Sequence, residues 1–495
     1  MRGERAPRAA RARLALAALA PAEVALLRAV ADALGGRGPA YLVGGAVRDA
    51  LLGRRPAGGR GHDVDVVVPH GALALARRLA DRLGGAFVVL DAARGAARVV
   101  VGPHRLDLTD VRGPTLAADL AARDFTVDAL AVPLGELLRT GHAAVLDPTG
   151  GLADLRARRL RPPAPTVLEE DPLRTLRAVR LEGALGLRLT PGAARAVRRA
   201  APGLARVAAE RVRDELLALL ALPRTAAALR RADRLGLLAV VLPEVEPMRA
   251  TPQPPPHRFT VLEHSLRAVA ACDAIVARPA ALAPLGEELA AHLADRLNGG
   301  VERRQVLKLA ALLHDVAKPE TRRCADGEVR FFAHDVLGAA RARAIGERLR
   351  LPGAATTVLE RLVRHHLRPM HLATADALTP RARYRFYRDL GAESRDLLLL
   401  ALADAAAVRG EPPGRVWRRA TLIRELLRGW RDAEREATAP PLVRGEDVMA
   451  HFGIPPGPEV GRLLALAREA QALGRVRTRE EALAYLDAVR ARPLE

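Results

Sequence analysis

The spacing of apolar and polar residues changes near residue 148. Before this point, short runs rich in Val, Leu and Phe predict strands, because such residues at a period of two suit a half-buried sheet. These runs lie at 64–68, 87–90, 98–101 and 106–111. Residues 73–83 carry apolar positions at helical spacing and predict a helix. After residue 148 the strand signal nearly disappears, and amphipathic helical patterns fill 171–238 and 260–408.

The two patterns predict an α+β fold, with a mixed sheet and its helices first and all-helical regions afterwards. Proline-rich and glycine-rich stretches indicate where one region ends and the next begins. We expect a basic, disordered arm at 1–21, a head at 22–148, a helical neck at 149–246, an extended proline-rich hinge at 247–257, a second helical domain at 258–410 and a helical tail at 411–495.

Composition narrows the class of protein. The formal net charge of +21 favours a polyanionic partner such as nucleic acid, although only Lys308 and Lys318 among the 78 basic residues are lysines, which indicates a codon bias toward arginine. Two cysteines exclude a disulfide framework. Absence of an 18-residue apolar run argues against a membrane partner. The arginines before Leu14 and the apolar residues after them resemble the start of a signal peptide. We expect instead a basic arm that leads into a helix at Pro21, and a cytoplasmic protein.

Two carboxylates stand at the start of the first strand. Asp63 and Asp65 lie two residues apart, so both side chains point to the same face of the sheet. Like charges this close favour a divalent cation between them, as in phosphoryl-transfer sites. Asp107 on a later strand can complete a metal-binding triad. A solvated strand end is the alternative for an isolated Asp-x-Asp pair.

The segment upstream of this pair adds a candidate phosphate site. Gly44 and Gly45 form a turn before a predicted helix, where backbone amides can receive a phosphate. Arg48 adds a fork of donors. A glycine turn, paired acids and a third acidic strand together favour nucleotide chemistry over a solvated strand end.

The pattern Gly44-Gly45-x-x-Arg48-Asp49, followed by Asp63-x-Asp65, resembles the class II CCA-adding enzymes and bacterial poly(A) polymerases, which are polymerase β-like nucleotidyltransferases. Further blocks resemble this family in order and spacing, at 119–131, 147–155, 170–180 and 210–215. The resemblance implies a polymerase β-like head that transfers nucleotides from CTP and ATP to tRNA 3′ ends without a template. It implies Mg²⁺ on Asp63 and Asp65. The nucleotide-binding positions that it implies are Gly44, Gly45, Arg48, Arg123, Asp124, Asp128, Asp171, Arg174, Arg177 and Arg180.

Asp171 and Arg174 are expected to read the Watson–Crick edge of the incoming base from the same helix face. An ordinary surface ion pair is the alternative for these two residues alone. The chain departs from the family at Asp128, where relatives usually carry Asn, and at Ala122, where they carry Arg. The segment 110–119 is also shorter than in full CCA-adding relatives and resembles enzymes that add only the two cytidines.

Histidines and aspartates collect again in the second helical domain. His264, His314, Asp315 and Asp404 resemble the His…His-Asp…Asp pattern of HD phosphohydrolases. Such N/O ligands suit Mg²⁺ or a divalent transition metal, or a metal pair. His334 and His365 are candidates for a second ion. A degenerate domain that only supports tRNA is the alternative.

Three functions remain open besides tRNA nucleotidyl transfer: poly(A) polymerase, an HD phosphohydrolase with a vestigial head, and a non-catalytic RNA-binding protein. The distribution of charge favours RNA. Residues 41–130 carry 12 arginines against 10 acids, whereas residues 151–234 carry 18 arginines against 9 acids. A codon bias alone does not concentrate the excess in one region, so we expect the helices after the head to contact tRNA phosphates.

Overall fold

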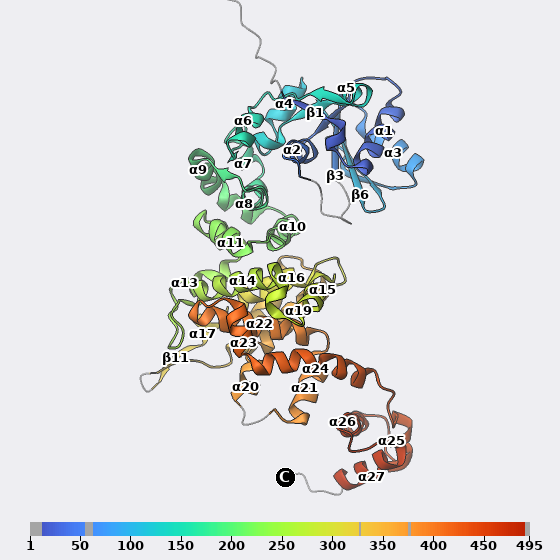
Figure 1. Ribbon diagram of the computed structural model, residues 1–495, viewed down its shortest axis with the longest axis vertical. Helices are drawn as coiled ribbons and strands as arrows, with labels where there is room; N and C mark the ends of the chain where they lie inside the picture. Colours follow the sequence, from blue (N-terminus) through green and yellow to red (C-terminus); the bar gives the residue numbers. More distant parts are fainter. Residues whose placement is uncertain (1–11, 55–62, 326–327, 375–377, 491–495) are drawn as a thin grey trace, which may run out of the picture. The chain divides into compact units, whose positions relative to one another are not determined.

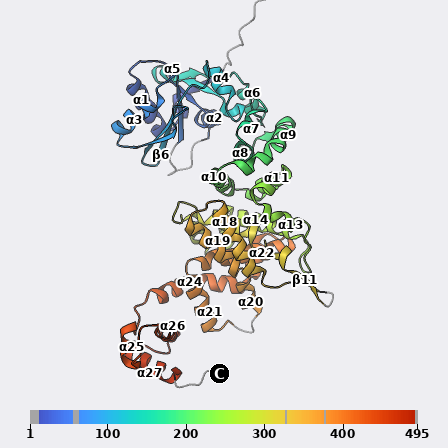
Figure 2. The same cartoon turned by 180° about the vertical axis from the view of Figure 1, so that it is seen from behind.

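The computed structural model describes residues 12–54, 63–325, 328–374 and 378–490 (Figures 1 and 2). Its internal contacts divide the chain into two compact units, each taken by itself below. The first unit is Met1–Val207 with Arg234–Val240, and the second is Ala208–Asp233 with Val241–Glu495. The residues of the predicted neck, 149–246, are thus shared between the two units.

A six-stranded mixed sheet forms the centre of the first unit. Its strands, in spatial order, are β4 (Ala86–Asp91), β5 (Ala96–Val101), β6 (His104–Asp110), β3 (Asp63–Val68), β2 (Tyr41–Val43) and β7 (Ala131–Pro133). Among these strands β3 and β6 pair in parallel, and the other neighbours pair antiparallel. Val64 and Val66 of β3 are almost wholly buried, as a central strand requires. The four strands predicted from the sequence are confirmed to within two residues at each end.

Helices cover this sheet and continue the chain. Helix α1 (Pro21–Leu34) packs against α3 (Ala72–Leu83), which also contacts β5 and β6 (Figure 1). Leu75 and Leu79 of α3 are buried, which confirms the helix predicted at 73–83. The remaining elements of this unit are α2 (Gly45–Leu51), α4 (Leu116–Ala121), η2 (Thr126–Asp128), α5 (Leu134–Thr140), α6 (Gly151–Arg156), β9 (Arg159–Leu160), α7 (Val167–Glu170), α8 (Leu173–Leu185), β10 (Arg188–Leu189), α9 (Pro191–Ala200), η3 (Ala201–Arg206) and α12 (Leu237–Val241).

The disordered arm predicted at 1–21 is wrong for residues 13–21. Strand β1 (Arg13–Ala15) pairs antiparallel with β8 (His142–Ala144), η1 (Leu16–Ala18) follows, and Pro21 already begins α1. Leu14 and Leu19 are 2% and 5% exposed. Two buried leucines and a backbone ladder fix this segment to the head. Residues 1–11 of the predicted arm lie outside the described residues.

The second unit is mainly helical. Its elements up to residue 438 are α10 (Ala209–Leu220), α11 (Thr225–Arg234), η4 (Pro243–Val245), α13 (Glu246–Ala250), α14 (Val261–Ala277), η5 (Pro279–Leu282), α15 (Gly286–Ala294), α16 (Arg303–Leu313), α17 (Lys318–Thr321), β11 (Arg322–Ala325), β12 (Glu328–Phe331), α18 (His334–Arg348), α19 (Gly353–His365), α20 (Arg368–Thr374), α21 (Pro380–Leu390), α22 (Glu393–Arg409), α23 (Pro413–Arg419) and α24 (Thr421–Thr438). Helices α14, α16, α19 and α22 pack together around buried leucines. This packing holds the histidine-bearing helices side by side.

Two local features of this unit differ from the sequence prediction. Helix α13 occupies the first residues of the segment predicted as an extended hinge. The proline there lies in the first turn of the helix, where no intrahelical hydrogen bond is lost, so it does not prevent helix formation. The antiparallel hairpin of β11 and β12 was not predicted. At the end of the unit, α25 (Gly445–Phe452), α26 (Pro458–Ala472) and α27 (Arg479–Arg490) share an apolar core. Among the described residues, no helix has the length and apolarity needed to cross a membrane.

Candidate functional site

Three neighbouring strands of the sheet place two of the predicted acids in one row. Asp65 on β3 lies opposite Asp107 on β6, and Asp107 lies opposite Arg98 on β5. Arg98 donates from Nε and Nη2 to the two carboxylate oxygens of Asp107 over 2.7 and 2.8 Å. Asp63 precedes Asp65 by two residues on the same face, and its Oδ1 is 3.8 Å from Nη1 of Arg105. We call Asp63, Asp65 and Asp107 the acid triad.

The electrostatics of the triad suit a divalent cation. Burial raises the pKa of Asp65 to about 6, and the neighbouring charges of Asp107 and Asp63 act in the same direction. Arg123 and Arg177 oppose this rise without cancelling it. Because the pKa of this carboxyl is raised beside two other carboxylates, a bound cation stabilises its ionised form. Carboxylate oxygens are also the ligands that Mg²⁺ prefers. The residues therefore fit the predicted magnesium site.

The glycine turn lies directly against this triad. Gly44 has φ of 71°, and a Cβ there would lie 2.8 Å from Oδ2 of Asp65 and 3.2 Å from Nη1 of Arg123. Both the backbone conformation and the close approach therefore require glycine. Gly45 begins α2 and lines a cavity that is also lined by Asp63, Asp65 and Asp107. The structure thus brings the predicted turn and the predicted acids together.

Arg48 makes its hydrogen bonds to two acids. Its Nε and Nη2 donate to the carboxylate of Asp49 over 2.9 Å each, and its Nη1 donates to Oδ1 of Asp128. Burial raises the pKa of Asp128, and its Oδ2 has no hydrogen-bond partner among the described residues. In this structure Asp128 orients Arg48, and the nucleotide-binding role of Asp128 stays a prediction.

The predicted nucleotide-selecting residues divide between the helix and the residues before it. Asp171 lies ahead of α8, so the prediction that it shares a helix face with Arg174 is wrong: Pro172 separates it from the first helical residue. Nε of Arg174 is 3.9 Å from Oδ2 of Asp171, and its Nη1 donates to the carbonyls of Ala122 and Val167 over 3.2 Å each. Burial lowers the pKa of Arg174. The pair lies close together, as predicted, through the turn before the helix.

Helix α8 also carries arginines to the triad. Nε of Arg177 lies 2.7 Å from Oδ2 of Asp124, whose Oδ1 accepts a hydrogen bond from the amide of Phe125. Arg177 and Arg180 line a cavity of about 500 Å³ in the first unit. The other charged residues that line it are Glu23, Arg48, Asp49, Arg54, Asp63, Asp65, Arg98 and Asp107. Arg98 and Arg54 were not predicted, because a single arginine carries no distinctive signal in a chain with this codon bias.

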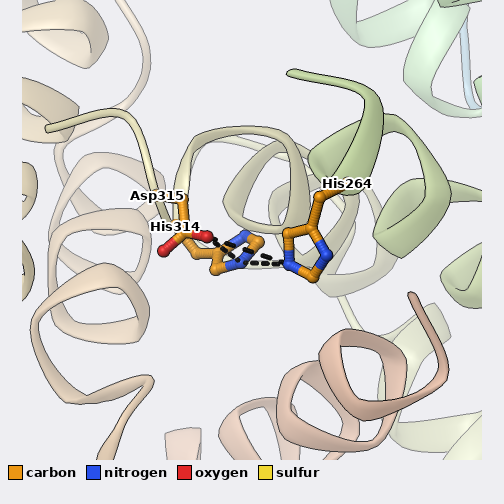
Figure 3. A group of neighbouring side chains, drawn as sticks. All are labelled: His264, His314 and Asp315. Atoms are coloured by element: carbon orange, nitrogen blue, oxygen red, sulfur yellow. Dashed lines mark hydrogen bonds and ion pairs between the residues drawn. The ribbon is translucent and has the colours of Figure 1, made fainter. Parts of the chain in front are cut away.

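A second group of candidate ligands lies in the second unit. The Nε2 atom of His264 on α14 is 3.3 Å from that of His314 at the end of α16 (Figure 3). Oδ2 of Asp315 is 3.2 Å from Nε2 of His314 and 3.8 Å from Nε2 of His264. Asp404 on α22 places Oδ1 2.9 Å from Nε2 of His264. The four residues predicted from the sequence are thus close neighbours.

The other oxygen of Asp315 faces a second pair of histidines. Its Oδ1 is 3.5 Å from Nε2 of His334 and 3.6 Å from Nε2 of His366. These two ring nitrogens are 3.3 Å apart. His366 takes the place expected for His365, since only one of two successive residues at the end of a helix can point to the centre. The adjacent His365-His366 pair signalled a ligand without showing which residue supplies it.

Hydrogen bonds from the ring Nδ1 atoms hold three of these imidazoles ready for a metal. His314, His334 and His366 place Nδ1 within 2.7–3.0 Å of the carbonyls of Ala311, Phe331 and Val363. Nδ1 is then the protonated nitrogen of each neutral ring, and Nε2 presents its lone pair. Two such lone pairs facing each other at 3.3 Å repel unless a cation or a proton lies between them. The residues therefore fit metal ions on both sides of Asp315.

The charges at this centre keep its carboxylates ionised. Burial opposes ionisation of Asp315, but in the metal-free centre the charges of protonated His314, whose own pKa is raised by Asp315, and of Lys318 outweigh it and hold the pKa of Asp315 well below its usual value. Nζ of Lys318 lies 2.7 Å from Oδ2 of Asp315. Burial likewise opposes ionisation of Asp404, and the hydrogen bond from His264 helps to lower the pKa of Asp404 below its usual value. Both acids are therefore available as anionic ligands.

Comparison with known proteins identifies three successive family matches. The model described as "Poly A polymerase head domain" matches residues 40–161, "Probable RNA and SrmB- binding site of polymerase A" matches 186–249, and "HD domain" matches 285–408. An A-adding tRNA nucleotidyltransferase of Deinococcus radiodurans is 39% identical over 456 residues, which cover 90% of this chain and 94% of the relative. The chain belongs to the tRNA nucleotidyltransferase family.

Other members of the tRNA nucleotidyltransferase family are similarly close. A CC-adding tRNA nucleotidyltransferase of Thermus thermophilus is 39% identical over 458 residues, which cover 90% of this chain and 93% of the relative. The solved structure titled "The complex structure of CCA-adding enzyme with ATP" shares the fold with a TM-score of 0.61 and 21% identity, and it covers 97% of both chains. The predicted family and the predicted fold class are confirmed. The individual site residues remain predictions.

Proposed function

We propose that this tRNA nucleotidyltransferase extends tRNA 3′ ends from CTP, and from ATP where the product requires it, without a nucleic-acid template. One observation carries the proposal: the acid triad and the arginines Arg48, Arg98, Arg177 and Arg180 line the same cavity. Carboxylates suit a magnesium-bound triphosphate, and arginines suit its phosphate oxygens. A tRNA substrate also supports the expected cytoplasmic location.

The residues of the head divide the chemistry between them. Asp63 and Asp65, with Asp107 beside them, would hold Mg²⁺, which would supply positive charge for the reacting phosphates and lower the pKa of the 3′ hydroxyl. The arginines of the cavity orient the triphosphate, which brings its α-phosphate in line with the hydroxyl. Asp171 accepts a hydrogen bond from the exocyclic amine of the base, and Arg174 donates to a ring nitrogen or carbonyl. These two contacts replace a template.

The product is proposed to be a CC end. Strand β6 ends at Asp110 and α4 begins at Leu116, so only residues 111–115 join them. Full CCA-adding enzymes, which the sequence resembles, generally carry a longer loop at this place, and that loop is associated with the switch from C to A addition. The Deinococcus relative is named as an A-adding enzyme and the Thermus relative as a CC-adding enzyme, and both are 39% identical to this chain, so sequence identity alone does not indicate the product. The short connection supports addition of C alone.

The test uses two tRNA substrates, one without CCA and one without only the terminal A. Each is incubated with CTP, with ATP and with both, and the 3′ ends are sequenced. Two cytidines on the first substrate and no change on the second support the proposal. Incorporation of neither nucleotide contradicts it, a single A on the second substrate assigns A addition, and a long A tail assigns poly(A) polymerase activity.

We propose a second activity for the His/Asp centre, hydrolysis of a phosphate ester, because two groups of ligands share Asp315. His264, His314 and Asp315 form one group, and Asp315, His334 and His366 form the other, with the ligand atoms of each group within 4.8 Å of one another. Mixed imidazole and carboxylate ligands suit Mn²⁺, Fe²⁺ or Ni²⁺. Such ions supply a nucleophile by lowering the pKa of water.

Metal content and hydrolysis of bis-p-nitrophenyl phosphate test this second activity. The full chain is expected to bind two transition-metal ions that Asp315→Ala removes, with loss of hydrolysis. His371→Ala serves as a matched control, since His371 belongs to neither group of ligands. A chain that binds no transition metal contradicts the metal centre, and a metal-loaded chain without hydrolysis contradicts the activity.

A further inference from the structure

Arg98 occupies an unusual position for an arginine beside a metal-binding triad. It lies on β5 directly across from Asp107, and its guanidinium takes both carboxylate oxygens of that residue in a two-bond fork. The side chain of Arg98 is 35% exposed and that of Asp107 is 22% exposed. The contact is therefore open to the cavity that both residues line.

The guanidinium of Arg98 also interacts electrostatically with Asp63 and Asp65. The hydrogen bond to Asp107 raises the pKa of Arg98, and the charges of Asp107, Asp63 and Asp65 raise it further, against the effect of burial. Arg98 is thus a cation held in the field of the whole triad. The positive charge of Arg98 repels a divalent ion that approaches Asp107, and the two hydrogen bonds from Arg98 occupy both carboxylate oxygens.

Three further arginines near the triad, Arg48, Arg123 and Arg177, also pair with acids other than the triad members. Arg48 pairs with Asp49 and Asp128, and Arg177 pairs with Asp124. Nε of Arg123 lies 3.5 Å from Oδ2 of Asp119. These acids lie outside the triad. Arg98 holds both carboxylate oxygens of Asp107 with two short hydrogen bonds, whereas Nη1 of Arg105 lies 3.8 Å from Oδ1 of Asp63.

We propose that Arg98 is the counter-ion of the acid triad in the nucleotide-free enzyme and exchanges Asp107 for the triphosphate when nucleotide binds. Without nucleotide, Arg98 screens the triad and weakens the hold of Asp107 on a divalent cation. A triphosphate in the cavity offers the same guanidinium several anionic oxygens, and its own charge replaces the carboxylate as partner. Asp107 is then released to the metal at the moment the substrate arrives. Arg98 is a positioning residue that acts through Asp107, and the role of the triphosphate rests on the proposed function.

Removal of Arg98 therefore has two opposite effects. In Arg98→Ala, Mn²⁺ binding without nucleotide is expected to tighten roughly tenfold, the size that one positive charge a few ångströms from a divalent ion gives in a solvent-like dielectric. The KM for CTP is expected to rise by a similar factor, because a triphosphate ligand is lost. A purely structural loss would weaken both. Arg98→Lys keeps the charge without the fork, so its Mn²⁺ affinity stays near the wild-type value while the KM for CTP rises.

Mn²⁺ binding is measured on the full chain by calorimetry and electron paramagnetic resonance. The binding that disappears in Asp63→Ala/Asp65→Ala belongs to the head, which separates it from ions at the His/Asp centre. Arg82→Ala is the matched control, since Arg82 forms an exposed pair with Asp32 and does not line the cavity. It is expected to leave both quantities unchanged. Tighter Mn²⁺ binding in Arg98→Ala supports the proposal, and equal or weaker binding overturns it.

A double variant tests whether Asp107 carries the effect. In the Asp107→Asn background, Arg98→Ala is expected to change Mn²⁺ affinity by less than about twofold, because no carboxylate remains to be released. A full tenfold gain in that background overturns the role of Asp107. The Mn²⁺ measurements need no nucleotidyl transfer, so they stand even if the wild-type chain extends no tRNA, an outcome that contradicts only the proposed function.

Discussion

The acid triad of the head and the His/Asp centre of the second unit are both proposed to bind metal ions, but their surroundings shift the pKa of a buried aspartate in opposite directions. In the head, three carboxylates share one side of a sheet, and burial with mutual repulsion raises the pKa of Asp65 to about 6. In the His/Asp centre, imidazoles and Lys318 hold the pKa of Asp315 well below its usual value although the residue is buried. In the head, the neighbouring arginines do not cancel the rise in the pKa of Asp65, so an added cation stabilises its ionised form, whereas in the His/Asp centre the neighbouring positive charges outweigh the burial of Asp315.

This difference matches the two proposed tasks. A triad that lines a solvent-accessible cavity readily exchanges magnesium together with an incoming triphosphate. A buried centre whose imidazoles are already oriented by backbone carbonyls retains its ions between turnovers. The two sites should therefore respond to mutation, pH and chelation independently.

The largest expected effect comes from Asp65→Ala. Loss of this ligand should reduce nucleotide addition by about a thousandfold or more, because the metal contributes several kcal/mol of transition-state stabilisation. The transition-metal content of the His/Asp centre should not change. Rates of CMP incorporation and metal analysis of the same preparation check both statements. Loss of transition metal in this variant would mean that the sites are coupled.

The reciprocal variant is Asp315→Ala. It should remove the ions of both ligand groups, whereas His366→Ala should remove one, because Asp315 faces both pairs of histidines. Nucleotide addition should stay within about twofold of the wild-type rate, as expected for a site that does not contribute to transition-state stabilisation in the head. Metal analysis of the purified chains gives the stoichiometry. Retention of two ions by Asp315→Ala would break the assignment of a shared ligand.

The turn beside the triad gives a smaller effect. Gly44→Ala places a Cβ at a positive φ and against Oδ2 of Asp65, so the carboxylate must move. We expect addition to fall on the order of a hundredfold, the cost of displacing a reacting group by about 1 Å. Gly53→Ala is the matched control: Gly53 also has a positive φ, and nothing lies within 4 Å of its Cβ position. Equal losses in the two variants would mean that backbone strain, and not Asp65, is responsible.

Stability provides a test of the raised pKa. The pKa of Asp65 in the folded head is about 6, above its ordinary value of 3.8, so the free energy of unfolding falls as the pH rises from about 4 to 6 and stays lowered above that range. Without divalent cations, Asp65→Asn should raise the free energy of unfolding at pH 8 by about 2 kcal/mol. The gain should vanish below about pH 4, where the carboxyl is protonated in both states. Denaturant titrations at the two pH values measure it, and an equal gain at both would contradict the ionisation argument.

Asp128→Asn should have the smallest effect. An asparagine keeps an oxygen for the hydrogen bond from Arg48 and removes a buried charge whose pKa is raised by burial. The KM for CTP should change by less than about threefold, since the loss of charge attraction and the relief of desolvation oppose each other. Steady-state kinetics check this. A loss of tenfold or more would mean that the charge of Asp128, beyond its oxygen, is needed.

The sequence predicts the elements that carry a period and the residues that stand in spaced motifs. Strand β3, with its alternating acids and valines, shows both signals, so its place and its chemistry were predictable. The Arg98–Asp107 pair was not, because it depends on the register between β5 and β6, which no local pattern reveals. Asp171 was placed on a helix that begins two residues later, because a residue that precedes a proline favours an extended backbone, and Asp171 has φ of −135° and ψ of 91°. Choosing His366 over His365 likewise required the orientation of the end of α19.

The most direct test of the two independent sites is one time course of CMP incorporation into tRNA lacking CCA, run with the wild-type chain, Asp65→Ala and Asp315→Ala. We expect two cytidines from the wild-type chain, the same product at the same rate from Asp315→Ala, and none from Asp65→Ala. Extension by Asp65→Ala at a rate near that of the wild-type chain, or failure of Asp315→Ala to extend, would contradict the assignment of nucleotidyl transfer to the acid triad alone.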